Sequence, residues 1–218
     1  MLIAVPAETQ AHEKRVAATP ETVKKFIAAG CQVVVQQGAG EAASLPDADF
    51  EQAGASLAKD FKAACANADL VLKVSPLSKA EIKQVKKGTT VAGMAAPFTN
   101  PLLQEYCAHG LSYFCMEMVP RISRAQSMDV LSSQANIAGY KSVLLAIEHY
   151  QRFFPMLMTA AGTVQPAQVL VMGAGVAGLQ AIATARRLGA KVDVFDVRAA
   201  AKEQVESLGG KFVEVASE

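Results

Sequence analysis

A glycine-rich hexapeptide, Gly173-Ala-Gly-Val-Ala-Gly178, constrains the fold of this chain more than any other feature of its sequence. It follows the apolar run 169–172 and precedes a segment typical of a helix, so it predicts a tight turn from a strand into a helix. Glycines allow the turn, the approach of a pyrophosphate to the backbone, and close packing of helix on sheet. The unpaired amides that begin such a helix attract a diphosphate. The predicted cofactor-binding residues here are Gly173, Gly175, Val176, Ala177 and Gly178; the alternative is a β–α turn that is merely tight.

An acidic residue at the end of the next predicted strand supports a dinucleotide site. Asp196 lies 23 residues after Gly173, where a carboxylate accepts hydrogen bonds from a ribose 2′-hydroxyl and repels a 2′-phosphate. This favours NAD(H) over NADP(H), although Arg198 offers a charge that would suit a phosphate. We assign Asp196, Val197 and Arg198 to the cofactor site. The alternative for Asp196 is an ordinary solvated residue at a strand end.

Short apolar runs alternate with helix-length segments along the whole chain, which is typical of parallel sheets flanked by helices. Helices are predicted from Pro20, with Thr19 as N-cap, to before Gly30, over Phe50–Ala53 with Asp47 as cap, and over Phe61–Ala66, Ala80–Val85, Pro101–Ala108, Ser133–Tyr150, the segment ending near Leu188, and Ala201–Ser207. In the long helix, Ile137, Tyr140, Leu144 and Ile147 recur at spacings of three and four, which predicts that they share one face. The predicted strands are Leu2–Val5, Val33–Val35, Leu70–Val74, the neighbours of Val91, Ser112–Cys115, Gln168–Met172, Lys191–Asp196 and Lys211–Val215.

These elements predict an α/β fold with two Rossmann-like parallel-sheet domains joined by a long helix, the second domain truncated. The expected divisions are 1–132, an N-terminal α/β domain ending in a polar loop at 119–132; 133–152, the connecting helix; and 165–218, the first half of an NAD-binding Rossmann domain. A complete domain of that kind needs about six strands, and three are predicted after residue 168.

Composition excludes several other classes of protein. With 51% apolar residues and a net charge of +1, the chain has neither the composition of a disordered segment nor the basic excess of a nucleic-acid-binding surface. Its first residues lack the pattern of a signal peptide, and polar residues interrupt every apolar stretch before it could span a bilayer. The four cysteines form no C-x-x-C pair, so we expect reduced thiols and no metal site.

Residues 119–132 break the helical and strand periodicity and carry many functional groups. The stretch Val119-Pro-Arg-Ile-Ser-Arg-Ala-Gln-Ser-Met-Asp-Val-Leu-Ser-Ser-Gln-Ala-Asn-Ile-Ala-Gly-Tyr140 resembles the signature loop of the proton-translocating nicotinamide nucleotide transhydrogenase family. Within that family the chain is similar to the soluble NAD(H)-binding component, the alpha subunit. Supporting matches are Glu13-Lys-Arg-Val-Ala-Ala-Thr-Pro20, Gly38-Ala-Gly40, Asp69-Leu-Val-Leu-Lys-Val74 and the glycine-rich hexapeptide.

The resemblance implies roles for the loop residues. Arg121 and Gln126 would hold the nicotinamide end of NAD(H), with Gln126 also directed towards the second nucleotide. Asp129 and Ser132 would orient the carboxamide. Arg121, Gln126 and Asp129 are therefore the candidate catalytic residues, while Arg124 is expected to be a solvated charge. The chemistry agrees, because a guanidinium, an amide, a carboxylate and a hydroxyl can together recognise a ring that carries an amide.

The resemblance also implies an activity and partners. NADH bound here would pass hydride, with AB (Si-to-Re) specificity, to NADP⁺ on a partner component, and a membrane component would couple this to proton translocation. A homodimer is implied, cytoplasmic and peripheral to the inner membrane through its partner subunits. Hydride exchange between two nicotinamides needs positioning more than acid–base groups, because no substrate oxygen or nitrogen has to be protonated.

Two alternatives remain open from the sequence. The surroundings of Arg15 and Lys73 resemble alanine dehydrogenase, in which such a pair binds a keto acid and a histidine follows the fourth strand. Here Ala92–Phe98 contains no titratable side chain at that place, and His109 lies in a predicted helix. We therefore expect Arg15 and Lys73 to be scaffold residues. The other alternative is a truncated, non-catalytic subunit that binds no nucleotide unaided.

Overall fold

The structure, a computed structural model, describes residues 1–214. The chain forms two compact units, Met1–Asp129 and the segment that begins at Val130. Each unit has its own parallel sheet and its own hydrophobic core. The predicted α/β fold with two parallel sheets is confirmed.

The first unit contains a six-stranded parallel sheet in the order β3-β2-β1-β4-β5-β6. The strand order reverses between β1 and β4, and in open α/β sheets the carboxyl ends of the strands at such a point are the usual place for a ligand. Strand β3 was not predicted, because it has three residues and buries only Ala58 fully. The strands are β1 (Leu2–Val5), β2 (Gln32–Gln36), β3 (Ser56–Ala58), β4 (Leu70–Lys73), β5 (Thr90–Gly93) and β6 (Ser112–Cys115).

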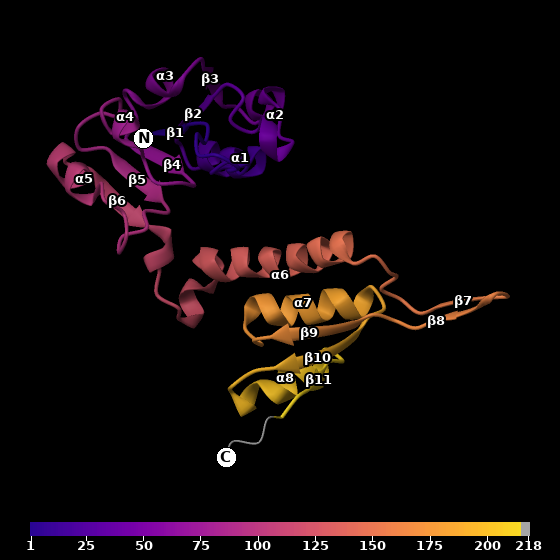
Figure 1. Ribbon diagram of the computed structural model, residues 1–218. Helices are drawn as coiled ribbons and strands as arrows, with labels where there is room; N and C mark the ends of the chain where they lie inside the picture. The colour runs from indigo at the N-terminus through magenta and orange to yellow at the C-terminus, as the bar shows by residue number, and fades with distance from the viewer. Residues whose placement is uncertain (215–218) are drawn as a thin grey trace. The chain divides into compact units, whose positions relative to one another are not determined.

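Helices cover both faces of this sheet (Figure 1). Successive side chains of a strand point to opposite faces, so Ile3 and Val5 pack on one side with Val23 and Phe50, whereas Ala4 packs on the other. Helices α1 (Pro20–Ala28) and α2 (Asp47–Gln52) lie on the first face, and α3 (Phe61–Cys65), α4 (Lys79–Ile82) and α5 (Leu103–His109) on the second. Short 3₁₀ helices are η1 (Glu41–Ala43), η2 (Met116–Met118) and η3 (Ser123–Met128).

Local signals set most helix ends. Thr19 caps α1 by accepting a hydrogen bond from the Thr22 amide, Pro20 is the first helical residue, and Gly30 has φ +82°, all in accord with the sequence. The expected cap at Asp47 is wrong. Pro46 occupies the N-cap of α2, and the Asp47 carboxylate instead accepts from the Gly38 amide at 2.9 Å, because a tertiary partner was within reach.

The second unit places three parallel strands, in the order β11-β10-β9, under helices α7 and α8. The predicted strand Lys211–Val215 ends at Phe212, and Val215 lies outside the described residues. Its elements are α6 (Val130–His149), β7 (Leu157–Thr159), β8 (Gly162–Val164), β9 (Gln168–Met172), α7 (Val176–Arg187), β10 (Lys191–Phe195), η4 (Ala199–Ala201), α8 (Lys202–Ser207) and β11 (Lys211–Phe212).

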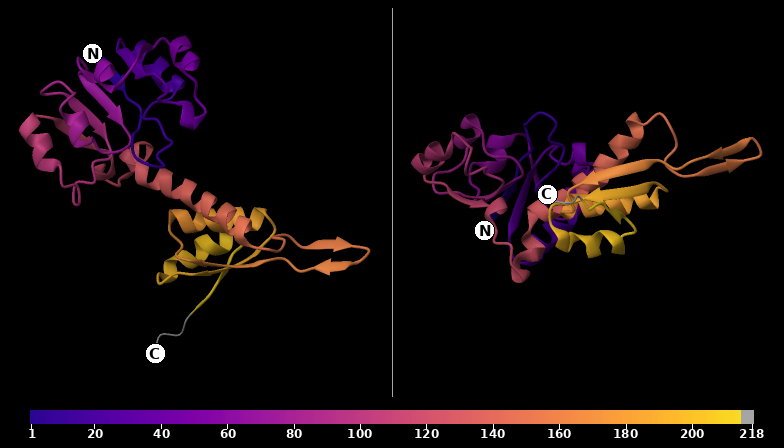
Figure 2. Two further views of the ribbon diagram at one scale, coloured as in Figure 1. Left: turned by 45° about the horizontal axis from the view of Figure 1, so that its top comes forward. Right: turned by 60° about the horizontal axis from the view of Figure 1, so that its bottom comes forward.

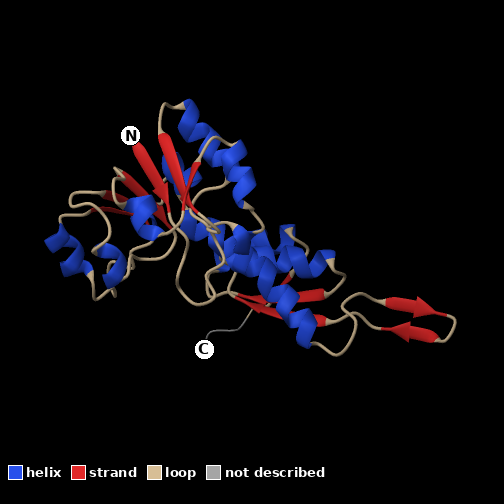
Figure 3. Cartoon of the chain, turned by 90° about the horizontal axis from the view of Figure 1, so that it is seen from above, coloured by secondary structure: helices blue, strands red, loops and turns tan. Residues whose placement is uncertain are grey.

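An antiparallel hairpin, β7–β8, was not predicted. It extends away from the three-stranded sheet in every view (Figures 1, 2 and 3), and each of its residues is exposed. The sheet itself is covered on one face: Val192 and Val194 are buried beneath the helices, whereas Leu170 and Met172 on β9 are 59% and 80% exposed.

Helix α6 packs along α7 within the second unit. The stripe that makes this contact contains Gly139, Val143 and Ile147, whereas Ile137 and Tyr140, expected on the same face, are 56% and 49% exposed. The sequence did not identify the stripe because α6 is apolar around most of its circumference, so periodicity alone does not select a face.

Gly139 is expected to be essential for this packing. A Cβ added there would overlap the carbonyl oxygen of Ala177, which as backbone in α7 cannot move aside. We expect Gly139→Ala to lower the free energy of unfolding of the second unit by at least about 2 kcal/mol. Denaturant titration measures this. Ala138→Ser, on the exposed side of the same helix, is the control and should change stability by only about 0.5 kcal/mol. Equal stabilities would contradict the close crossing.

Candidate functional site

The glycine-rich turn connects β9 to α7 in a conformation that requires glycine at two positions. Gly173 has φ +99°, which side chains disfavour, and a Cβ at Gly178 would overlap the carbonyl oxygen of Gly173. A Cβ added to Gly175, in contrast, would meet no atom within 4 Å. Gly175 is the N-cap of α7 and no side chain caps this end by a hydrogen bond. The first amides of α7 therefore face an open surface that suits an anion.

Asp196 lies beside this turn, immediately after β10. Its carboxylate accepts a hydrogen bond from the Ala174 amide at 2.7 Å and another from the Arg198 amide at 2.8 Å. The Arg198 guanidinium also donates to it, through Nε and Nη2, both at 3.0 Å. This guanidinium, followed by the two amides, holds the pKa of Asp196 well below its usual range, so the group is an anion at neutral pH. Arg198 and Asp196 thus form an ion pair across the turn.

The signature loop is compact rather than irregular. Its residues Ser123–Met128 form the 3₁₀ helix η3, anchored by buried Ala125. Arg121 Nε lies 3.6 Å from Asp129 Oδ2, and the Asp129 amide donates to the Gln126 carbonyl. The Gln126 side chain is exposed.

The predicted site residues are divided between the two units. Arg121, Gln126 and Asp129 belong to the first, whereas Ser132, in the first turn of α6, belongs to the second together with the glycine turn and Asp196. Val197 is 88% exposed. That all of these residues meet at one cofactor stays a prediction.

Sequence reasoning missed Glu117, which lies just before the loop. Glu117 Oε1 accepts from the amides of Ala95 and Ala96 at 2.8 and 2.6 Å, and its other oxygen is buried. Ala96 adopts φ +49°, a left-handed conformation that a non-glycine residue keeps only when its surroundings hold it. A lone glutamate between two methionines gave no signal of this tertiary contact.

Lys73 and Arg15 both have carboxylate partners. Lys73 Nζ is buried at the end of β4, 2.9 Å from Glu8 and 3.6 Å from Glu81, and Glu8 also accepts from the Val74 amide. Glu13 binds Arg15 at 2.6 Å, and this contact lowers the pKa of Glu13 to about 2. The role of Glu8 was also missed by sequence reasoning, since its partner lies 65 residues away.

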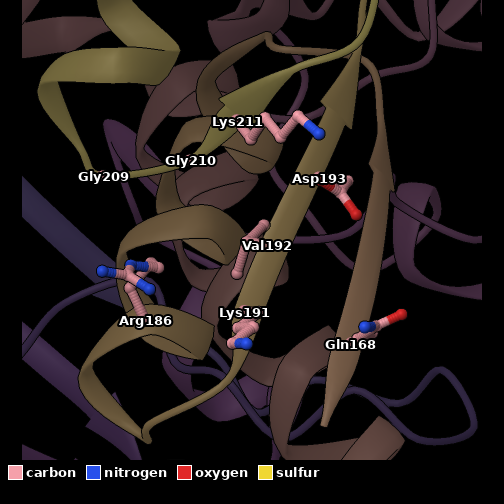
Figure 4. Close-up of a pocket in the computed structure, with 8 residues that line it drawn as sticks. All are labelled: Gln168, Arg186, Lys191, Val192, Asp193, Gly209, Gly210 and Lys211. Atoms are coloured by element: carbon pink, nitrogen blue, oxygen red, sulfur yellow. The ribbon is translucent and has the colours of Figure 1, made fainter. Parts of the chain in front are cut away.

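A cavity of about 380 Å³ lies elsewhere in the second unit (Figure 4). The first residues of β9, β10 and β11 line it, so the cavity lies at the amino ends of these strands. The glycine turn and Asp196 follow the opposite, carboxyl ends of β9 and β10. The cavity is therefore distinct from the predicted cofactor site. Its lining residues are Gln168, Arg186, Lys191, Val192, Asp193, Gly209, Gly210 and Lys211.

Among residues 1–214, no helix combines the length and apolarity that crossing a bilayer requires.

Comparison with known proteins identifies relatives over the whole chain. The chain is 50% identical to an NAD(P) transhydrogenase subunit alpha polypeptide of Rhodospirillum rubrum, with 100% of this chain and 58% of that protein aligned. Among solved structures, transhydrogenase from Sinorhizobium meliloti matches with a TM-score of 0.96 and 50% identity, covering 99% of this chain and 62% of that one. An L-alanine dehydrogenase matches with a TM-score of 0.84 and 28% identity, covering 97% and 60%. The chain thus spans about three fifths of the length of these relatives.

Two family models match consecutive segments of the chain. The alanine dehydrogenase/PNT N-terminal domain matches residues 4–138, and the C-terminal domain of the same family matches residues 142–218. The fold, with its six-stranded and second parallel sheets, is that of the solved relatives. The family resemblance expected from the sequence is thereby confirmed. The chain belongs to the alanine dehydrogenase/PNT family, with the transhydrogenase alpha subunit as its closer branch and alanine dehydrogenase as a more distant one.

Proposed function

We propose that this chain belongs to the NAD(H)-binding component of a proton-translocating transhydrogenase. The observation that carries the proposal is the open amide end of α7 at Gly175, flanked by an ionised Asp196. Both features fit a dinucleotide. The amides and the helix dipole would attract the diphosphate, and the carboxylate would accept hydrogen bonds from the ribose hydroxyls. The 50% identity to a transhydrogenase alpha subunit supports this reaction over that of the more distant alanine dehydrogenases.

In this proposal the protein contributes binding and orientation. The bound nicotinamide supplies the hydride, which passes to NADP⁺ on a partner component. The amides of Val176 and Ala177 hold the diphosphate, while Asp196 accepts from the ribose. Arg121, Gln126, Asp129 and Ser132 form the set that fixes the nicotinamide and its carboxamide. The Arg121–Asp129 pair, 3.6 Å apart, joins two residues that lie on either side of exposed Gln126 in the chain.

The chemistry of the first unit favours transhydrogenation over amino-acid oxidation. Reductive amination of a keto acid needs a proton donor as well as a hydride. Lys73, the residue that would bind a keto acid in alanine dehydrogenase, is buried and paired with two glutamates. The loop after β5 presents Ala95 and Ala96 where a histidine would be expected. An alanine-dehydrogenase-like activity is the second candidate, favoured by the similar fold.

We further propose two partner components, one that binds NADP(H) and one that is embedded in the membrane. Together they would couple AB-specific hydride transfer to proton translocation. The chain would then be cytoplasmic and peripheral to the inner membrane.

We also propose a homodimer. Support comes from the hairpin β7–β8, because an isolated two-stranded ribbon is marginally stable in water. Residues 155–167 contain no charge, and Met156 and Met158 are 53% and 72% exposed. Such a ribbon fits an apolar surface on a second copy.

The reaction is tested with the natural polypeptide that carries this sequence. We expect NADH to reduce an NADP⁺ analogue when the partner component is present, measured by absorbance of the reduced analogue. NADH with pyruvate and ammonium should give no turnover. Turnover only in the second mixture would establish the alanine-dehydrogenase alternative. No NADH binding by calorimetry, alone or with partners, would establish a non-catalytic subunit.

Gln126→Asn shortens the loop amide by one methylene and leaves its chemistry intact. Because proximity governs hydride transfer, we expect the hydride-transfer rate to fall at least about tenfold while the NADH dissociation constant changes less than about threefold. Stopped-flow kinetics and calorimetry measure the two quantities. Gln52→Asn, at an exposed helix end of the first unit, is the matched control. Equal losses in rate and binding would assign Gln126 a simple binding role.

The hairpin is tested by adding a charge to it. Met158→Asp puts a carboxylate on the apolar ribbon, so we expect the dimer dissociation constant to rise at least about tenfold, because an unpaired charge would be buried. Sedimentation velocity at several concentrations measures this. Gln52→Asp introduces the same charge on an exposed helix end of the first unit and should leave dimerisation unchanged. Unchanged association of both variants would exclude the hairpin from the interface.

A further inference from the structure

We propose that Asp196 makes the cofactor site reject NADPH partly by holding the Arg198 guanidinium in an ion pair, so that this neighbouring cation is not free to bind a 2′-phosphate. This inference rests on the proposed NAD(H) binding and goes beyond it. It assigns to Arg198 a role in specificity opposite to the phosphate-binding role that its charge alone suggests.

The hydrogen bonds of Asp196 are nearly saturated. Oδ2 accepts from the Ala174 amide and from Arg198 Nη2, and Oδ1 accepts from the Arg198 amide and from Nε. The two amides belong to the backbone of the turns that follow β9 and β10. The guanidinium is the replaceable partner, since its side chain is 61% exposed whereas that of Asp196 is 6% exposed.

Arg198 is also tied to the turn itself. Nη2 donates to the Ala174 carbonyl at 3.2 Å in addition to Asp196. The guanidinium therefore lies across the glycine turn with contacts to both strand ends. Its charge is neutralised by Asp196, and its fork geometry, which would otherwise match a phosphate, is already used on a carboxylate.

The two cofactors would meet this pair differently. A ribose diol donates hydrogen bonds, so it can take over the positions of Nε and Nη2 on Asp196 while the exposed guanidinium turns to water. A 2′-phosphate only accepts, so it gains nothing from Asp196 and is repelled by it. To bind Arg198 it would have to break a bidentate ion pair and leave Asp196 with two partners fewer. Both cofactors displace Arg198 from Asp196, but only the ribose diol replaces the lost donors, so the arrangement penalises NADPH more than NADH.

A double-mutant cycle on the natural polypeptide tests this. NADH and NADPH affinities are measured by calorimetry for the unsubstituted protein, Asp196→Asn, Arg198→Ala and the double variant. We expect Asp196→Asn to tighten NADPH binding at least about tenfold by releasing Arg198, and the double variant to lose that gain. Arg198→Ala alone should keep its preference for NADH. Arg187→Ala, an arginine in the last turn of α7, is the matched control and should change neither affinity.

The outcomes separate this inference from the proposed function. Suppose the unsubstituted protein binds NADH. The role of Arg198 would then be overturned if Asp196→Asn shows no gain in NADPH affinity, or if the gain persists in the double variant. Either result would leave the proposed function standing. Failure to bind either cofactor would overturn both. Thermal denaturation shows whether Asp196→Asn folds. If it does not, Asp196→Ser is the second variant that releases Arg198, and the inference requires the same gain in NADPH affinity from it.

Discussion

The contact between Gly178 and the carbonyl of Gly173 is the constraint on which the candidate site depends. Only a residue without a Cβ lets α7 begin so close to the end of β9. That closeness leaves the amide end of the helix open over Gly175 and brings the Ala174 amide to Asp196 at the end of the neighbouring strand. The proposed phosphate and ribose sites would thus both follow from one backbone approach.

Carboxylates that accept from backbone amides fix the loops beyond the carboxyl ends of strands in both units. Glu8 holds the Val74 and Ser75 amides after β4, Glu117 holds those of Ala95 and Ala96 after β5, and Asp196 holds that of Ala174 after β9. Such charge-assisted bonds are strong. They keep in place the loops from which an α/β protein recognises its ligands, including the segment that leads from Glu117 into the signature loop.

Much of the fold could be predicted from local patterns. Thr19 and Pro20 begin α1 as expected, and the apolar runs at Leu2–Val5, Ser112–Cys115 and Gln168–Met172 are strands with those bounds. The errors have local and tertiary causes. Strand β3 was missed because it is too short to show a period, the Asp47 cap because Gly38 competed for the carboxylate, and the buried stripe of α6 because that helix is apolar on several sides.

The sequence by itself determined the glycine turn, the acidic residue one strand later and the family resemblance, because each depends on residue types at short spacings along the chain. Only the tertiary structure decided the partners of the charged groups: that Lys73 is buried between Glu8 and Glu81, that Glu117 holds Ala96 in a left-handed conformation, and that Arg198 lies on Asp196. The physical reason is that these pairings form where the ends of strands and their loops come together in space. Spacing along the chain does not report which charge reaches which carboxylate or amide, and a charge has a different function once its partner is set.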